Sequence, residues 1–365
     1  MNTTTLTGLE LRPLAVPADV SELETPAGHD FATMMDVRNR VYFEISGHHD
    51  ESMSAAELLP HYQPNPDEIR FMWVAILDGE FVGRAGIDIP LEEGSKTAFW
   101  QIELLRKSWG KGVGSAAYEL LENKAREHGR TVLQSWASHP AADGVEQIEP
   151  PTGFGSIPDD HAAHFYKRHG YSLEQVERNS AFDLRGSFEI VERLLAEATA
   201  AAEGYRVVQW EPPTAEEYVA GYAWMKSRMS TDAPSADLEF DEEVWDAERI
   251  ARHDALWTDA HQFVLVTAAQ HIATGELCAF NELVVGKDRA EASHQEDTLV
   301  LKEHRGHKLG MLVKCAGLVK WRELVPHSPR VLTYNAEENR PMLDINEAIG
   351  FTPIAYGGAW KKVLE

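Results

Sequence analysis

Two halves of this chain repeat the same short patterns at a fixed separation, and the repeat restricts the possible folds more than any other feature. Gly79 and Gly275 each stand in a turn that opens a strand-like segment, and they lie 196 residues apart (275 − 79 = 196). The same separation relates Gly8 to Gly204, and "SWGKGVG" at 108–114 to "HRGHKLG" at 304–310. One separation in three distant places indicates two copies of a single fold.

The separation shortens further along the chain. Gly170 and Gly350 each precede an aromatic residue and lie 180 residues apart (350 − 170 = 180), so the first copy holds 16 additional residues (196 − 180 = 16). The segment 138–160, rich in Pro, Gly and Asp, is the natural place for them. Apolar residues at helical spacing in "GSFEIVERLLAEATAAAEGY" predict a helix between the copies. We therefore predict a first domain over 1–186, a connecting helix over 187–203 and a second domain over 204–365.

Each copy shows the pattern of a mixed α/β fold. The predicted order is a strand, helices, two strands, the glycine turn, a long helix, a strand, a short helix and a last strand. Strands over 97–105 and 293–301 lead into the two turns, and amphipathic helices over 114–129 and 311–324 follow them. The first turn of a helix carries unpaired N–H groups, so a glycine turn at that point predicts a site for an anion such as a phosphate.

Composition limits the classes of partner. The formal charge of −25 argues against nucleic acid as a partner and is compatible with a cationic substrate, although acidity also serves solubility. The sequence has no apolar run of membrane-spanning length and no secretory pattern at its start. Its two cysteines, Cys278 and Cys315, cannot build a disulfide framework. We therefore expect a cytoplasmic protein without a membrane partner, and the sequence does not specify its oligomeric state.

Three familiar ligand motifs are absent. Neither glycine turn has the GxxxxGK[ST] pattern of nucleotide hydrolases, and Ser115 stands where a dinucleotide fingerprint needs its third glycine. His304 with His307, and His161 with His164, lack further ligands at a defined spacing, so the sequence predicts no metal site.

The turns and the segments after them resemble the GNAT superfamily of acetyl-CoA-dependent N-acetyltransferases. The family pattern is (Arg or Gln)-x-x-Gly-x-(Gly or Ala) between a strand and a helix, followed later by Ala-x-x-x-Tyr-x-x-x-Gly-(Phe or Tyr). Because the resemblance covers both halves, it implies two tandem GNAT domains, an arrangement also found in mycothiol synthase. Each domain would be a largely antiparallel sheet flanked by helices, with a splayed central pair of strands.

The resemblance also implies acetyl-CoA as the cofactor, with the pyrophosphate of coenzyme A at the turn and the pantetheine arm beside the strand before it. The cofactor-binding residues implied in the first copy are Leu104, Leu105, Trp109, Gly110, Lys111, Gly112, Val113, Gly114 and Ser115. Those implied in the second copy are Leu299, Val300, Leu301, Arg305, Gly306, His307, Lys308, Leu309, Gly310, Asn335 and Asn339.

Each copy departs from the family pattern. The first has Trp109 at the Arg or Gln position but keeps the tyrosine that corresponds to the usual general acid, Tyr166. The second keeps Arg305 but has Lys308 at the first glycine position, and Asn346 stands where the tyrosine would be. Neither copy is complete by this criterion.

Acetyl transfer to an amine needs a neutral amine, a donor to the thioester oxyanion and a proton for the leaving thiolate. A backbone N–H near Leu104 or Val300 suits the oxyanion, Tyr166 suits the proton donor, and Asn346 can donate a hydrogen bond to the thiolate. Several family members place the base 11 residues before the Arg or Gln position, which is His294 in the second copy (305 − 11 = 294) and Ala98 in the first. Further candidates for the base are Glu103, Asp297 and, through water, Glu296.

Structural alternatives exist for these residues. Tyr166 also fits simple packing on an amphipathic helix, His294 fits a solvated turn, and the asparagines Asn335 and Asn339 fit helix capping. The acidic segment 229–250 is either a solvated stretch or a lining that attracts a cationic acceptor. We therefore expect an acetyltransferase for the amine of a small molecule, with the second copy favoured as the catalyst. The alternatives are a non-catalytic acyl-CoA-binding protein and an enzyme that acetylates protein lysines or N-termini.

Overall fold

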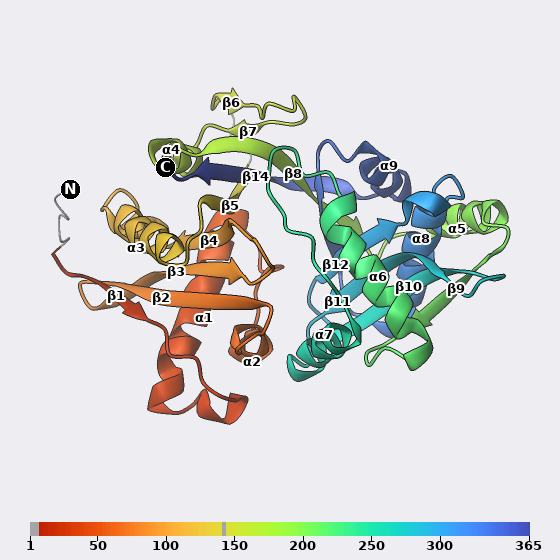
Figure 1. The fold of residues 1–365 in the computed structure, drawn as a ribbon, viewed down its shortest axis with the longest axis horizontal. Coiled ribbons are helices and arrows are strands. Elements are labelled where there is room, and N and C mark those ends of the chain that lie inside the picture. Colours follow the sequence, from red (N-terminus) through yellow and green to blue (C-terminus); the bar gives the residue numbers. More distant parts are fainter. Residues whose placement is uncertain (1–6, 141–143) are drawn as a thin grey trace. The chain divides into compact units, whose positions relative to one another are not determined.

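The computed structural model describes residues 7–140 and 144–365, and these form two compact units. The first unit holds the chain up to Val176 together with Ala236–Glu239 and Gly357–Glu365. The second unit holds Glu177–Ser235 and Phe240–Tyr356. Figure 1 colours the elements along the chain. Two short segments from the later part of the chain therefore complete the first unit.

The first unit is a sheet in the order β1-β2-β3-β4-β5-β14-β8, covered by helices. Neighbouring strands from β1 to β4 are antiparallel, whereas β4 and β5 are parallel. Its strands are β1 (Leu9–Pro13), β2 (Glu68–Leu77), β3 (Glu80–Pro90), β4 (Thr97–Leu104), β5 (Val132–His139), the first part of β8 (Ser172–Asp183) and the last part of β14 (Thr352–Val363). Its α-helices are α1 (Pro26–Ser46), α2 (Ala55–Leu58), α3 (Val113–Glu127) and α4 (His161–Arg168). Short 3-10 helices are η1 (Val20–Glu22), η2 (Leu59–Tyr62) and η3 (Arg106–Ser108), and β6 (Gln147–Ile148) with β7 (Ile157–Pro158) forms a small hairpin in the long loop.

The second unit repeats this plan, with the sheet order β9-β10-β11-β12-β13-β8-β14. Strands β9 to β12 are antiparallel to their neighbours, and β12 and β13 are parallel. Its strands are β9 (Tyr205–Trp210), β10 (Phe263–His271), β11 (Leu277–Val285), β12 (Ser293–Val300), β13 (Arg330–Ala336) and the remaining parts of β8 and β14. Its helices are α5 (Glu189–Ala201), α6 (Glu216–Asp232), α7 (Ala247–Asp259), η4 (Lys302–His304), α8 (Leu309–Leu324) and α9 (Arg340–Ile349).

The prediction of a mixed α/β fold in two tandem copies is confirmed. Glycines expected at matching turns adopt the same left-handed conformation, with φ of 83° at Gly8 and 89° at Gly204, and of 82° at Gly79 and 77° at Gly275. One detail was wrong: three strands, not two, precede the glycine turn in each unit. The missed strand in the first unit, β2, is a largely continuous apolar run without alternation, a pattern that does not separate a buried strand from a buried helix.

Each unit has its own hydrophobic core. In the first unit, Phe31 and Met34 of α1 pack on Val74 of β2. In the second unit, α8 packs on one face of the sheet through Leu318 and Trp321, and α6 and α7 contribute Tyr222 and Ile250 to a cluster with other strand residues. The predicted connecting helix is α5, which packs against α8 inside the second unit.

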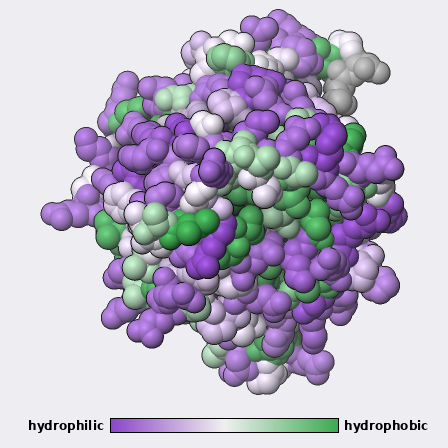
Figure 2. All heavy atoms as spheres, turned by 90° about the vertical axis from the view of Figure 1, so that its right-hand side faces the viewer, coloured by the Kyte–Doolittle hydropathy of each residue, from purple (hydrophilic) through white to green (hydrophobic). Residues whose placement is uncertain are grey.

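The surface of the molecule is chiefly polar. The face drawn in Figure 2 is mostly hydrophilic, with hydrophobic side chains in small groups between polar ones. Over the described parts of the chain, no helix is both long and apolar enough to cross a membrane.

Candidate functional site

The glycine turn of the first unit leaves the start of helix α3 open. Gly112 is the N-cap residue with φ of 84°, and no side chain caps the helix. The first intrahelical bond is donated by the N–H of Ala116 to Gly112. The N–H groups of the preceding helical residues therefore have no acceptor within the helix and can face an anion. Gly114 is needed for a different reason, because a Cβ there would lie 3.1 Å from the ring of Phe165.

The turn of the second unit has the same geometry with more positive charge. Lys308 is the N-cap residue of α8 and adopts the left-handed conformation with φ of 54°, which glycine fulfils in the first unit. Gly310 lies where a Cβ would be 3.0 Å from Ile345. Arg305 and Lys308 are exposed, and α8 also lacks a side-chain cap. This turn presents main-chain N–H groups and two side-chain cations together.

Trp109 and Arg305 occupy equivalent places and make equivalent bonds. The indole Nε1 of Trp109 donates to the carbonyl of Leu104 over 2.9 Å, and Nε of Arg305 donates to the carbonyl of Val300 over 3.3 Å. Trp109 also stacks on His161, with ring centroids 4.3 Å apart and nearly parallel planes. The first turn is therefore flanked by an aromatic pair, whereas the second has a guanidinium group.

Five of the predicted cofactor-binding side chains are buried in hydrophobic clusters, so only their backbone can reach a ligand. They are Leu105, Val113, Leu299, Leu301 and Leu309. Ser115 lies beside the other helix, with Oγ 3.3 Å from Nε2 of His169. Lys111, Gly306 and His307 are exposed at the turns.

A parallel pair of strands separates in each unit. Strands β4 and β5 are paired only over Thr97–Phe99, although β4 continues to Leu104. Strands β12 and β13 are paired only over Ser293–Gln295, although β12 continues to Val300. Beyond these points the facing N–H and C=O groups of the two strands are not bonded to each other, as the predicted splay requires.

Strand β12 has a β-bulge that β4 lacks. The pairing of β11 with β12 shifts between Asn281 and Leu283, so that Glu296 and Asp297 together stand opposite Glu282. The pairing of β3 with β4 is regular from Gly83 to Asp88. Bulges redirect side chains and are common beside active sites. The bulge places two carboxylates at the start of the splayed part of the second unit.

Glu103 is held in an ion pair in the first unit. Arg84 donates two hydrogen bonds to its carboxylate, over 2.6 and 3.0 Å, and Tyr42 donates a third over 3.0 Å. Burial alone would raise the pKa of Glu103, but the Arg84 charge outweighs it and leaves the pKa lowered. A carboxylate held in this way has a weak affinity for protons, which does not favour a role as general base.

The carboxylates of the second unit divide into paired and unpaired positions. Buried Lys226 lies 2.6 Å from Asp297 and 3.4 Å from Glu282, and Tyr222 donates a hydrogen bond to Glu282. The pKa of Glu296 is raised, first by its dense surroundings and then by the charges of Asp297 and Glu282. Its side chain nevertheless reaches solvent. Of these acids, Glu296 is the one with increased affinity for a proton and access to a ligand.

His294 lies in the paired first part of β12, opposite Leu332 of β13, before the bulge. It contributes to the electrostatic surroundings of Glu296. The sequence gave no sign of the bulge, because Glu296 and Asp297 are adjacent acids in a strand with no glycine or proline near them.

Tyr166 lies at the corresponding end of the splay in the first unit. Its hydroxyl is 2.7 Å from Oγ of Ser135 on β5, and its ring stacks on Trp360 of β14 with centroids 4.8 Å apart. Burial raises its pKa, so the phenol keeps its proton. The side chain is 5% exposed, which makes packing a substantial part of its role.

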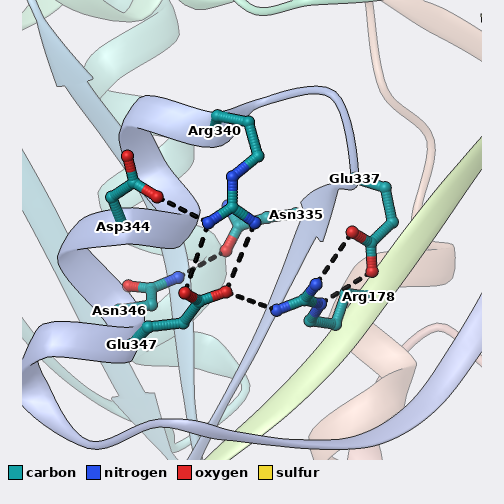
Figure 3. Close-up of polar contacts among 7 residues, drawn as sticks. All are labelled: Arg178, Asn335, Glu337, Arg340, Asp344, Asn346 and Glu347. Carbon is teal, nitrogen blue, oxygen red and sulfur yellow. Dashed lines mark hydrogen bonds and ion pairs between the residues drawn. The ribbon is translucent and has the colours of Figure 1, made fainter. Parts of the chain in front are cut away.

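Asn346 takes the equivalent place in the second unit, inside a network of polar side chains (Figure 3). Its Nδ2 donates to Oδ1 of Asn335 over 2.7 Å, and Nζ of Lys314 donates to its Oδ1 over 2.8 Å. Lys314 is fully buried, and burial lowers its pKa to about 7. The two bonds fix the orientation of the Asn346 amide. Sequence reasoning did not single out Lys314.

Charged residues hold helix α9 against β8 and β13 around this amide. Arg178 forms two hydrogen bonds with Glu337 and one with Glu347, and Arg340 also bonds to Glu347 (Figure 3). Asn339 is the N-cap residue of α9, but its side chain does not cap the helix. Of the two asparagines predicted here, Asn335 contacts Asn346, and Asn339 lies at the helix start.

The comparisons with known proteins agree with this geometry. Residues 31–145 match the acetyltransferase (GNAT) family. Among solved structures, a tandem GNAT protein from the clavulanic acid biosynthesis pathway is 23% identical, with a TM-score of 0.74 over 97% of this chain and 98% of the other. A GCN5-related N-acetyltransferase from Sphaerobacter thermophilus is 14% identical, with a TM-score of 0.59 over 98% and 96% of the two chains. No curated protein is significantly similar in sequence.

Proposed function

This chain has the tandem GNAT fold, with a GNAT family domain in its first half, and from that premise we propose that it is an acetyl-CoA-dependent N-acetyltransferase for the amine of a small molecule. We further propose that the second unit is the catalyst.

One observation carries the choice of the second unit: its β12 strand has both the splay and the bulge. The bulge brings Glu296 to the point where β12 leaves β13, whereas the regular β4 of the first unit has Glu103 paired with Arg84. The exposed Arg305 and Lys308 at the open start of α8 support the binding of a diphosphate beside the same strand.

Acetyl-CoA would supply the acetyl group and a thiolate leaving group. Glu296, whose pKa is raised, would accept a proton from the ammonium group of the acceptor, directly or through one water, and so produce the neutral amine that attacks. A backbone N–H of the splayed strand near Val300 would donate to the oxyanion. The oriented Asn346 amide would donate a hydrogen bond to the departing thiolate.

A pocket of about 760 Å³ in the second unit supports a cationic acceptor. It lies between α6 and residues 242–247, and its lining combines two tryptophans with several carboxylates. The lining includes Trp224, Trp245, Glu216, Glu242, Glu243 and Asp246. Aromatic faces and carboxylates both favour an ammonium group. We therefore expect Trp224→Ala to raise the KM for the amine while leaving acetyl-CoA affinity unchanged, measured by steady-state kinetics and calorimetry.

Calorimetric titration with acetyl-CoA tests which unit binds the cofactor. We expect Arg305→Glu to weaken binding by about 10-fold or more, because a charge-assisted contact to phosphate is lost and a repulsive charge gained. Lys111→Glu makes a matched charge change at the exposed turn of the first unit and should leave the affinity unchanged. Loss of binding in Lys111→Glu alone would transfer the working site to the first unit. No binding by the unmodified protein would refute the enzyme proposal.

Thiol release from acetyl-CoA in the presence of a panel of amines tests catalysis. We expect Glu296→Gln to lower kcat by ~10²- to 10⁴-fold with cofactor affinity retained, as for loss of a general base. Full activity of this variant would exclude Glu296 as the base and return the assignment to His294.

The absence of tyrosine at position 346 favours one alternative, an acyl-CoA-binding protein without turnover. Affinity for acetyl-CoA without thiol release on any amine would support that alternative. Acetylation of a protein lysine or N-terminus is distinguished by mass spectrometry of candidate proteins after incubation with the enzyme and acetyl-CoA.

A further inference from the structure

Three potential metal ligands meet in the second unit, at the edge of the sheet beside the glycine turn. Glu276 lies in the turn between β10 and β11, Cys278 is the second residue of β11, and His304 ends η4. In the part of the chain that the structure describes, this is the one group of three such side chains with donor atoms all within 4.8 Å of one another.

The backbone around these residues is fixed by the sheet. The N–H of His271 donates to the carbonyl of Glu276 over 2.8 Å and closes the turn. The N–H of Leu301 donates to the carbonyl of Cys278 over 2.9 Å, which ties β11 to the start of η4. The donors therefore project from a rigid framework, as a metal site requires.

The donor geometry is close to that of a tetrahedral site. Nε2 of His304 lies 3.5 Å from Oε2 of Glu276. Bond lengths of about 2.0–2.3 Å to nitrogen, oxygen and sulfur place neighbouring ligands of a tetrahedral Zn²⁺ about 3.3–3.8 Å apart. Small side-chain rotations suffice to bring all three donors into this range.

Tyr205 holds the imidazole in the orientation that a metal ligand needs. Its hydroxyl lies 2.8 Å from Nδ1 of His304 and stands ready to accept an N–H from that atom, which leaves Nε2 for a cation. Such a partner on the second ring nitrogen is typical of metal-bound histidine. His271 is also near, with its ring centroid 6.0 Å from that of His304.

The two cysteines of the chain have different surroundings. Cys315 lies in the apolar core, with its sulfur 3.5 Å from that of Met311. Cys278 is equally buried but shares its site with a carboxylate and an imidazole, and its thiol donates to the Glu276 carbonyl over 3.3 Å. An ion pair between His304 and Glu276 accounts for two of the residues without a metal, but it does not explain a thiol directed at them.

We propose that Cys278, His304 and Glu276 bind a Zn²⁺ ion that ties the β10–β11 turn to η4. One soft thiolate, one imidazole and one carboxylate suit Zn²⁺ and do not suit Mg²⁺ or Ca²⁺, which prefer oxygen ligands alone. Water completes the coordination on the side where Glu276, with a half-exposed side chain, meets solvent. Binding releases the thiol proton, so that a Zn–S bond replaces the S–H bond.

Burial, together with the Glu276 charge, raises the pKa of the Cys278 thiol to about 11. The metal must displace this proton, so affinity is expected to rise with pH. The site was not predicted from the sequence because Glu276 and Cys278 come from a different hairpin than His304, with no ligand spacing that marks them.

Titration of the metal-free, reduced, full-length protein with Co²⁺ tests the proposal, because thiolate coordination produces a charge-transfer absorption band. We expect one Co²⁺ per chain, a band that Zn²⁺ abolishes, and loss of the band in Cys278→Ser. Cys315→Ser, which changes the other buried cysteine, should retain it. No band in the unmodified protein, or a band retained in Cys278→Ser, would overturn the proposal.

Two half-exposed or partly exposed positions provide variants that do not disturb the core. Glu276→Gln and Tyr205→Phe should each weaken Co²⁺ binding by ~10- to 100-fold, the range seen when groups that support a metal site are removed. Zn²⁺ should also raise the melting temperature of the unmodified protein and not that of Glu276→Gln. Equal affinities in both variants and the unmodified protein would contradict the assignment, and circular dichroism confirms that each variant is folded.

Discussion

Lys314 and Lys320 lie on the same helix, α8, and nothing in "MLVKCAGLVKWREL" distinguishes them. Lys314 is fully buried and bonded to Asn346, whereas the side chain of Lys320 is 44% exposed and pairs with Glu323. At this scale the sequence predicted positions that follow a motif, such as Arg305 and Asn346. It missed residues such as Lys314 and Glu296, whose chemistry depends on burial and on strand pairing that only the fold creates.

Burial lowers the pKa of Lys314 to about 7, from a usual value of about 10.4, and this predicts a pH dependence of stability. Between these values the unfolded chain holds a proton that the folded chain does not, so the free energy of unfolding rises with pH in this range. The stability difference between the unmodified protein and Lys314→Met should change by up to ~1.4 kcal/mol per pH unit from pH 7 to 10. Urea unfolding across this range measures it. Lys320→Met is the control, and parallel curves for all three proteins would contradict the prediction.

At the scale of elements, the glycine turns were predicted well because each glycine has a local cause that the sequence exposes. Gly112 supplies a left-handed N-cap, and Gly114 and Gly310 allow the next helix to approach. The strands and helices around the turns were predicted to within about two residues for the same reason: their hydrophobic periodicity is local. The bulge in β12 was missed, because it is a mismatch between two strands and not a property of either sequence.

The second turn places Lys308 in the left-handed conformation, which costs a residue with a Cβ about 1 kcal/mol relative to glycine. Lys308→Gly should therefore raise the free energy of unfolding by about 1 kcal/mol, measured by chemical denaturation. Gly112→Lys makes the reverse change in the first unit and should lower it by a similar amount. A loss of stability in Lys308→Gly would show that side-chain contacts of Lys308 outweigh the backbone strain. Acetyl-CoA affinity should fall in Lys308→Gly if the cation contributes to binding.

At the scale of the molecule, the internal repeat predicted two copies of one fold, and the full-length likeness to a tandem GNAT protein bears this out. The sequence could not predict how the compact units share the chain. Residues 357–365 follow the second copy in sequence, yet they belong to the first unit. Strand pairing between segments so far apart leaves no local pattern. The domain boundary at residue 186 stays a prediction, while the compact units divide within β8, after Val176.

Trp360 gives this arrangement a measurable effect. Its ring is 1% exposed and stacks on Tyr166 within the first unit. Trp360→Ala should destabilise the first unit by about 3–5 kcal/mol, the usual cost of removing a buried tryptophan. Hydrogen exchange followed by mass spectrometry should then show faster exchange in α4 and β5, almost 200 residues earlier in the chain. Val363→Ala, at a position that is 60% exposed, is the control, and unchanged exchange in Trp360→Ala would refute the prediction.

The place of residues 357–365 also affects how the protein is made. Domains of a multidomain chain generally fold in order as they leave the ribosome, with the N-terminal domain first. Here the first unit lacks a strand segment until the last codons have been translated and the chain has been released. Any ribosome that stops early yields a first unit with an unfilled place in its sheet, and such a product is open to proteolysis. The final residues thus act as a test of complete synthesis for a domain that begins at the opposite end of the chain.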